Sequence, residues 1–192
     1  PRKKSTVQPE PPRVNLLVDI QAKLQAGKGS GYARWAKVFN LKQMAQTVNF
    51  LTEHQLLDYA ELAEKAAAAT AHHNELSAQI KAAEKRIAEI AVLRTHIINY
   101  AKTRETYVAY RKAGYSKKFR EEHEQEILLH QAAKNAFDEM GVKKLPKVKD
   151  LQAEYAKLLE EKKKTYAEYR RSREEMRELL TAKANVDRVL KM

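Results

Sequence analysis

The chain has 192 residues, 37 Lys and Arg against 25 Asp and Glu, and no cysteine. Because cysteine is absent, disulfide scaffolds, CxxC zinc sites and thiol catalysis are excluded. No apolar run reaches the roughly 18 residues of a transmembrane helix, and no apolar region near Pro1 resembles a secretory signal. We therefore expect a cytoplasmic protein without a membrane span, and the lack of an initial Met suggests a piece of a longer chain.

Few residues interrupt the chain, since it contains only five Gly and five Pro. Residues 1–12 (PRKKSTVQPEPP) are predicted to form a flexible basic linker. The sequence GKGSG at 27–31 is predicted to form a turn. Between this turn and Gly114, helix-forming residues such as Ala, Leu, Glu, Lys and Gln predominate. The predicted helices cover 13–26, 32–54, 58–112, 117–140 and 148–190.

Capping residues indicate where these helices begin and end. Asp58, with Glu61 three residues later, resembles a capping box that begins the longest helix. Gly114 and Gly141 are predicted to end the two helices before them, because glycine adopts the left-handed conformation that often follows a helix. Asn40 is a candidate N-cap that would interrupt the second helical region.

The two longest predicted helices, 58–112 and 148–190, carry the seam of a coiled coil, with seam residues three and four positions apart. Both seams also contain polar residues, so each alone would be a weak zipper. The simplest closure is intramolecular, with the two helices antiparallel, the small residues Ala66 and Ala69 allowing close approach, and segment 113–147 at the tip. A homodimeric coiled coil is the competing arrangement.

These patterns contain no run of alternating apolar and polar residues that would indicate a strand. We therefore predict an all-α fold with two parts. A long antiparallel, coiled-coil-like helical hairpin covers 58–192, and a smaller N-terminal helical subdomain covers 13–57. Trp35, with Val38 and Phe39, is predicted to anchor the core of the smaller part.

Positive charge is concentrated in two blocks that the predicted hairpin brings together at its tip. Residues 100–120 hold seven cations against one carboxylate, and residues 141–150 hold four against one. The first block is interleaved with tyrosines: Tyr100, Tyr107, Tyr110 and Tyr115. Cations for phosphates beside rings for bases are typical of a single-stranded nucleic-acid surface. The competing interpretation is a solvated helix face with the tyrosines in the core. The candidate DNA-binding residues are Lys102, Arg104, Arg111, Lys112, Tyr115, Lys117, Lys118, Arg120, Lys143, Lys144 and Lys147.

No pattern of catalytic residues emerges from the sequence. HExxH, Gly-rich phosphate loops with Walker spacing and GxSxG are all absent. His123 and His130 share a helix face with Glu126, but two helical turns separate the imidazoles too far for one metal ion. We therefore predict that this chain is not an enzyme, with no catalytic residue, no metal site and no cofactor.

Three segments carry a resemblance to a known family. They are VNLLVDIQAKLQAGKGSGYARWAKVFNLKQMAQT at 14–47, THIINYAKTRETYVAYRKAGYSKKF at 95–119 and TAKANVDRVL at 181–190. Together with their surroundings, they resemble the C-terminal region of relaxases, the mobilisation nucleases of integrative and conjugative elements from gut Firmicutes. The likeness extends over nearly the whole chain but contains no short diagnostic motif.

The resemblance implies an accessory role in the transfer of mobile-element DNA. Relaxases of this kind nick DNA through a tyrosine, assisted by a histidine-bound metal, in an N-terminal domain to which no residue here corresponds. The expected partners are DNA at the transfer origin or the transferred strand, and a coupling protein or other conjugation protein. The alternative function is a helical protein–protein interaction or oligomerisation module.

Overall fold

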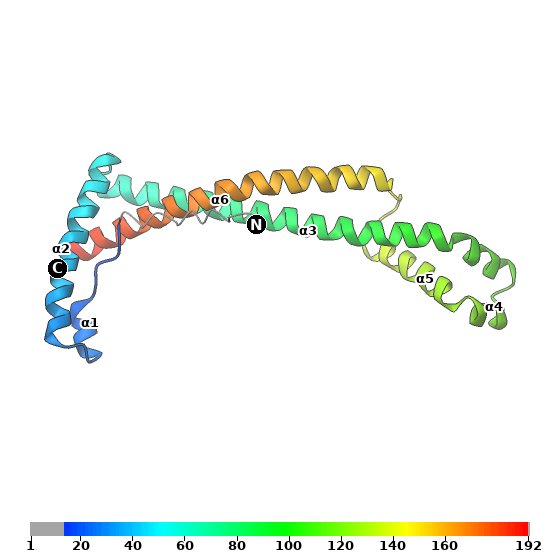
Figure 1. The fold of residues 1–192 in the computed structure, drawn as a ribbon. Helices are drawn as coiled ribbons and strands as arrows, with labels where there is room; N and C mark the ends of the chain where they lie inside the picture. Colours follow the sequence, from blue (N-terminus) through cyan, green and yellow to red (C-terminus); the bar gives the residue numbers. More distant parts are fainter. Residues whose placement is uncertain (1–13, 192) are drawn as a thin grey trace, which may run out of the picture. The chain divides into compact units, whose positions relative to one another are not determined.

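The structure is a computed structural model that describes residues 14–191, and within these residues every regular element is a helix. The predicted all-α class is therefore confirmed, while the predicted linker 1–12 lies outside the described residues. None of the described helices is both long enough and apolar enough to cross a membrane. The elements, labelled in Figure 1, are α1 (Ile20–Gln25), α2 (Ser30–Glu53), α3 (Tyr59–Lys112), α4 (Lys117–Glu122), α5 (Glu124–Glu139) and α6 (Val148–Leu190).

The chain divides into two compact units. Unit 1 consists of the residues up to Ser77 together with those from Ala167 onward, and unit 2 is Ala78–Tyr166. Both boundaries fall inside the long helices α3 and α6, so each unit holds one part of each helix. The boundary expected from the sequence lay between residues 57 and 58.

The helix ends follow the local signals in the sequence. The Asp58 carboxylate accepts the backbone N–H of Glu61 at 3.1 Å, and α3 begins at the next residue after Asp58. Gly114 and Gly141 have φ angles of +62° and +65°, where a side chain would be strained, and they follow the ends of α3 and α5. The predicted beginning of α3 and the predicted ends of α3 and α5 are thus confirmed.

In unit 1, α3 and α6 pack antiparallel, as predicted. Leu62 and Ala66 near the beginning of α3 are buried with Leu179 and Ala182 near the end of α6. Phe50 of α2 joins the same cluster, so that three helices share one core. The small side chains of Ala66 and Ala182 are completely or almost completely buried, which allows the two helix backbones to approach closely.

Polar residues of the seam find partners inside this chain. The His73 ring of α3 stacks on the Tyr169 ring of α6, with centroids 4.4 Å apart. His73 Nδ1 also lies 3.2 Å from Ser172 Oγ, and Ser172 is buried. These polar groups of the seam thus find their partners within the chain, as the intramolecular closure predicts.

The beginning of unit 1 differs from the prediction of a helix over 13–26. Helix α1 begins only at Ile20, where the Asp19 side chain accepts the N–H of Ala22 at 2.9 Å. Residues 14–18, which we call the strap, are not helical. Val14 and Leu17 of the strap are buried, so this segment completes the unit 1 core without forming a helix.

Asn40 explains both this difference and a second one. It lies inside an unbroken α2 and does not act as the predicted N-cap. Its side chain reaches the strap instead, where Oδ1 accepts the N–H of Val18 at 2.7 Å and Nδ2 donates to the carbonyl of Val18 at 2.9 Å. A helix through the strap would need the same backbone groups for its own hydrogen bonds.

Two further amide side chains hold the strap in the same way. Gln43 of α2 accepts the N–H of Asn15 at 2.9 Å, and Asn185 of α6 accepts the N–H of Leu17 at 2.9 Å. The strap therefore exchanges the local hydrogen bonds of a helix for bonds to residues that lie far away in the sequence.

In unit 2, α3 packs against α6 and then against α5. Ile90 and Leu93 of α3 are buried with Leu151 of α6 and with Ala133 and Phe137 of α5. Ion pairs also join α3 and α6 on the surface: Arg86 with Glu154 and Lys162 with Glu84, each at 2.7 Å. The order of these contacts along the chain makes α3 and α6 antiparallel in this unit as well.

Segment 113–147 does not form the tip of an α3–α6 hairpin, contrary to the prediction. Its helical part is divided at His123 into α4 and α5, and α5 runs back along the last turns of α3 (Figure 1). Leu151, in the first turn of α6, packs beside Ile90 and Leu93, so the remainder of α3 pairs with α5. The physical reason is the apolar face of α5, whose residues Ile127, Ala133 and Phe137 are buried.

Candidate nucleic-acid interface

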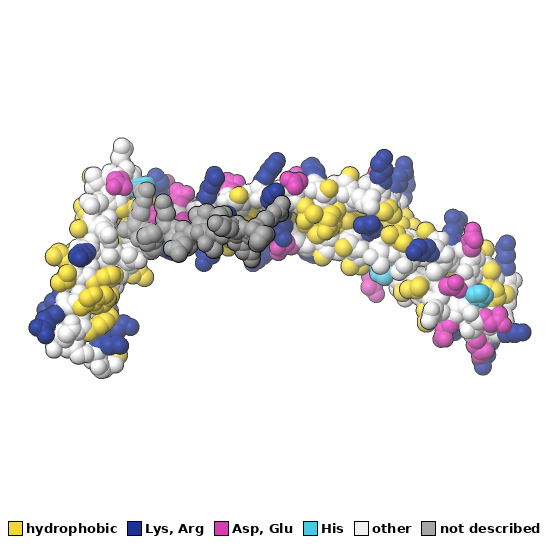
Figure 2. All heavy atoms as spheres, in the orientation of Figure 1, with side chains coloured by type: hydrophobic (Ala, Val, Ile, Leu, Met, Phe, Trp, Pro, Cys, Tyr) yellow, Lys and Arg dark blue, Asp and Glu magenta, His cyan; other side chains and the backbone are white. Residues whose placement is uncertain are grey.

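The predicted DNA-binding residues all lie in unit 2 and fall into two groups. The first group occupies the end of α3, the turn after it and α4: Lys102, Arg104, Arg111, Lys112, Tyr115, Lys117, Lys118 and Arg120. The second group, Lys143, Lys144 and Lys147, lies in the loop between α5 and α6. Figure 2 shows Lys and Arg side chains gathered where α6 begins.

The structure does not bring the two groups together, contrary to the prediction. Val142, next to the lysines of the loop, packs against the cluster that contains Ile90 and Phe137, as do Ile97 and Tyr100 of α3. Arg111 lies fourteen residues beyond Ile97 on the same helix, which is about 20 Å at the helical rise. The antiparallel pair formed by α5 and the end of α3 therefore separates the basic loop from the turn that follows α3.

Most of these cations lack an acidic partner. Among the described residues, the only ion pair of the ten predicted cations is Lys117 with Glu121, at 3.9 Å between two exposed side chains. Elsewhere in the same unit, Arg86 and Lys162 each lie 2.7 Å from a carboxylate. The charge of the two groups is therefore available to an anionic partner, whereas that of the α3–α6 pair is partly neutralised.

The cations of α3 occupy more than one side of the helix. Arg104 and Arg111 are seven residues apart and lie within about 20° of each other around the helix axis, while Lys102 is about 200° away from Arg104. A shallow groove of about 320 Å³ runs along the helix and is lined by Arg104, Glu105, Val108, Ala109 and Lys112. Arg104, Arg111 and Lys112 thus form the most coherent basic surface on α3.

The tyrosines beside these cations are mainly core residues. The rings of Tyr100 and Tyr107 both stack on the His130 ring, with centroids 4.5 and 4.2 Å from it, and Tyr110 is buried. Only Tyr115 among the four predicted tyrosines is well exposed, at 57%. The expectation of several stacking rings at this surface is therefore wrong, and the competing interpretation of core tyrosines holds for three of them.

Tyr115 owes its exposed position to the turn that ends α3. It has a φ of +61°, unusual for a residue with a side chain, directly after the left-handed Gly114. The N–H of Tyr115 donates to the carbonyl of Tyr110 at 3.1 Å, and the two rings meet edge-on at 5.2 Å. This pairing of a backbone bond with an apolar contact is the Schellman arrangement, and it holds Tyr115 between the cations of α3 and α4.

His130 is buried, with 3% exposure. Thr103 donates its hydroxyl to the carbonyl of Asn99 at 2.7 Å, so its oxygen accepts a hydrogen bond from His130 Nδ1 at 3.1 Å. Burial, and then the charge of Lys134, lower the pKa of His130 below its ordinary value. His130 is thus a neutral, structural residue.

This lowered pKa predicts a dependence of stability on pH. The unfolded chain binds a proton at His130 near pH 6.5, but the folded chain resists it, so the free energy of unfolding falls as the pH drops below about 6.5. Urea denaturation followed by far-UV circular dichroism at pH 7.5 and 5.5 measures this loss. The His130→Phe variant keeps a ring in the stack without a titrating group, and its loss is expected to be smaller. An equal fall in the free energy of unfolding in the parent protein and in the His130→Phe variant would mean that His130 does not cause the pH dependence.

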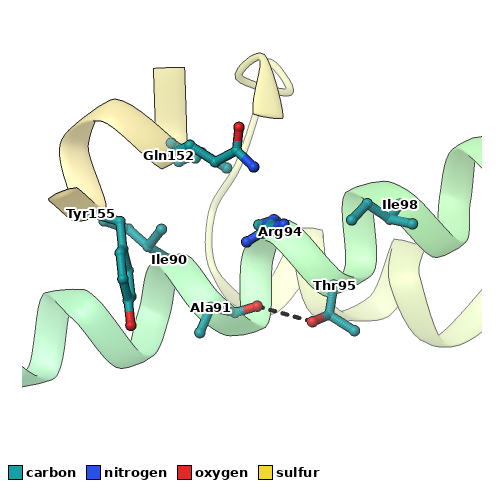
Figure 3. A pocket seen from close by; sticks show the side chains of 8 residues that line it. Ile90, Ala91, Arg94, Thr95, Ile98, Gln152 and Tyr155 are labelled. Atoms are coloured by element: carbon teal, nitrogen blue, oxygen red, sulfur yellow. Dashed lines mark hydrogen bonds between the residues drawn. The ribbon is translucent and has the colours of Figure 1, made fainter. Parts of the chain in front are cut away.

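A groove of about 450 Å³ lies beside α3 where α6 begins (Figure 3). Ile90, Ile98 and Leu151 supply its apolar lining, and Gln152 and Tyr155 of α6 stand on one side. Arg94, which the sequence analysis did not select, also lines this groove and has no ion pair with a described residue. It adds a further cation close to the basic loop 143–147.

No group of three or more His, Asp or Glu side chains in residues 14–191 is arranged to hold a metal ion. His123 pairs with Glu126 at 3.0 Å, while His130 is occupied with Thr103, so the two histidines have separate roles. The described part of the chain is thus an all-α protein with unpaired basic surfaces. No family, curated protein or solved structure matches it.

A second basic surface escaped prediction because Trp35 was assigned to the core. Trp35 is 52% exposed and Val38 is also exposed, so they do not anchor the N-terminal helices. The core position next to them is occupied by Ala36, which is fully buried. One signal in the sequence could have revealed this surface: no acidic residue occurs between Asp19 and Glu53.

Proposed function

We propose that this chain is a DNA-binding accessory domain that performs no catalytic step. The observation that carries the proposal is the set of cations without acidic partners at the end of α3 and in the loop 143–147. Each can contact a phosphate and release a counterion, because none except Lys117 is held by a carboxylate of the described residues. The separation of the two groups suits a partner that is extended, as DNA is.

We also propose that this domain belongs to a relaxase. The resemblance of 14–47, 95–119 and 181–190 to relaxase C-terminal regions makes the transfer origin or the transferred strand the expected DNA. In that setting the nicking reaction belongs to another domain, and the helical domain holds DNA during nicking and transfer. Contact with a coupling protein remains the alternative if DNA binding fails.

The test is fluorescence anisotropy of labelled single-stranded and duplex DNA, titrated with the protein at several salt concentrations. Replacing Arg104, Arg111 and Lys112 with Ala is expected to weaken binding at least about tenfold. The slope of log K against log salt should fall by about one for each lost phosphate contact. These residues are exposed on α3, so the fold should be unaffected.

The matched control replaces Lys157, Lys163 and Lys164 with Ala, which removes the same charge from exposed positions that lie among glutamates of α6. Lys157 already pairs with Glu161 at 3.7 Å. This control should bind almost as well as the parent protein. If both triple variants lose affinity equally, only total charge matters and a defined interface on α3 is wrong.

A further inference from the structure

The first half of α2 displays a row of aromatic rings. Tyr32, Trp35 and Phe39 are spaced by three and four residues and therefore share one side of the helix. The Trp35 ring lies 5.3 Å from the Tyr32 ring and 5.1 Å from the Phe39 ring, with which it is stacked at an interplanar angle of 24°. Although its neighbours flank it, Trp35 keeps 52% of its surface open. A large ring that keeps about half of its surface open in the folded chain is suited to a contact with a partner.

The charge around this row has one sign only. Five cations and no carboxylate occur between Asp19 and Glu53: Lys23, Lys28, Arg34, Lys37 and Lys42. None of the five forms an ion pair with another described residue, and Lys28 Nζ lies 5.9 Å from the centre of the Tyr32 ring. Figure 2 shows apolar side chains directly beside Lys and Arg at α1 and the beginning of α2. The partner of this surface must therefore be an anion that also offers apolar area.

The way that rings and cations alternate narrows the choice of anion. Lys42 lies two turns after Trp35 on the same side of α2, and Arg34 lies on the side of exposed Leu41, so apolar and basic positions are mixed. A helix that lies on a membrane keeps its apolar and charged residues on opposite faces. A helix that docks into a protein groove needs an apolar stripe longer than this one, which ends at Lys42. A nucleic-acid single strand instead alternates phosphates with bases, and this mixture matches it.

We propose that the exposed surface of α2 around Tyr32, Trp35 and Phe39 binds a single-stranded nucleic acid. A base lies against the open part of the Trp35 ring, and Lys28, Arg34 and Lys42 contact the phosphates on either side. The proposal extends the DNA-binding function proposed above to a second surface, and it rests on residues of unit 1 alone. It also assigns the single-stranded form to this surface, since bases in a duplex are stacked on each other and do not offer a free face.

Trp35 is the one tryptophan of the chain, so tryptophan fluorescence reports this site alone. The experiment titrates the whole chain with oligothymidylate at low salt and measures fluorescence and anisotropy together. We expect quenching that saturates along with binding, because a stacked base quenches the indole. An abasic oligonucleotide of equal length, which has the phosphates but no bases, should bind at least about tenfold more weakly and quench little. Equal quenching by both strands would overturn the proposal.

Variants test whether the Trp35 ring itself is needed for binding, and whether the α2 surface binds independently of the basic surface of unit 2. Trp35→Ala should weaken oligothymidylate binding at least about tenfold, whereas Trp35→Tyr should retain most of it. Val48→Ala, at an exposed apolar position of α2 about 20 Å beyond Trp35, is the matched control and should bind normally. The Arg104, Arg111 and Lys112 triple variant should still show Trp35 quenching at saturation. If the triple variant also bound duplex DNA normally, the function proposed for unit 2 would fail, but quenching of Trp35 would still support binding at α2.

Polyglutamate and vesicles of anionic lipid test the other two anions. We expect neither to quench Trp35 at concentrations where oligothymidylate does. Quenching by polyglutamate comparable to that by oligothymidylate would identify an acidic protein as the partner and would overturn the proposal. A blue shift of Trp35 emission on the vesicles, with no response to oligothymidylate, would also overturn the proposal and would identify a membrane surface as the partner.

Discussion

Replacing Leu179 with Ala is expected to lower the free energy of unfolding of unit 1 by about 2–5 kcal/mol. Leu179 is 1% exposed and lies where α6 meets α3 and α2, in contact with a cluster that includes Leu62 and Phe50. Because α6 is held from both sides, its neighbours cannot collapse into the cavity that Ala leaves. The loss therefore includes a cavity term in addition to the lost burial.

The neighbouring residue supplies the control. Leu180 is 42% exposed, so Leu180→Ala changes the same amount of side chain in the same helical turn but leaves the core intact. Its effect on the free energy of unfolding is expected to stay within about 0.5 kcal/mol. Urea denaturation followed by circular dichroism and by Trp35 fluorescence measures both variants. Equal losses from the two substitutions would mean that α6 does not pack against α3 in this register.

Those parts of the fold that depend on neighbouring residues could be predicted from the sequence. Asp58 caps α3 through the N–H groups of the next few residues, and Gly114 and Gly141 end helices through their own φ angles. The antiparallel pairing of α3 and α6 was expected because both helices carry the repeat of three and four that marks a coiled-coil seam, and closure within one chain is the simplest way to cover it. In each case the information lies within a few residues of the feature.

The parts that could not be predicted depend on residues far apart in the chain. The strap gives up helical hydrogen bonds because Asn40 and Asn185 lie 22 and 168 residues from their bonding partners. Asn40 looked like an N-cap because the same side chain that binds a local N–H can bind a distant one. In α5, the burial of His130 depends on α3 lying alongside, which periodicity within α5 alone does not reveal.

The candidate site divides in the same way. Charge clusters are visible in the sequence, and the cations of the end of α3 are indeed without acidic partners among the described residues. Whether an aromatic residue is buried or exposed is decided by packing, so the sequence left open whether Tyr107 is a stacking ring or a core residue, and it assigned Trp35 to the core. In the structure Tyr107 stacks on His130, whereas the core position predicted for Trp35 is wrong because its ring is half exposed.

Replacing Asn185 with Ala is expected to cost about 2–4 kcal/mol and to release the strap. Asn185 is 2% exposed, accepts the N–H of Leu17 at 2.9 Å, and donates to the carbonyl of Asn15 at 2.9 Å and to Thr47 Oγ at 3.0 Å. Truncation leaves the buried N–H of Leu17 without a partner and removes the bond to the part-buried carbonyl of Asn15. Hydrogen exchange at Leu17 should then increase far more than exchange in the rest of the unit.

Two further variants test whether the loss of stability in Asn185→Ala comes from the lost hydrogen bonds to the strap. Asn74→Ala, at an exposed position of α3, is the control and should change the free energy of unfolding by no more than about 0.5 kcal/mol. Asn185→Asp keeps the size of the side chain and the oxygen that accepts from Leu17 but loses both donated bonds, so it should also be strongly destabilising. If Asn185→Ala unfolds at the same urea concentration as the parent chain and protects Leu17 equally, the amide does not hold the strap. The strap would then be held by the burial of Val14 and Leu17 and by the hydrogen bonds from Asn40 and Gln43 of α2.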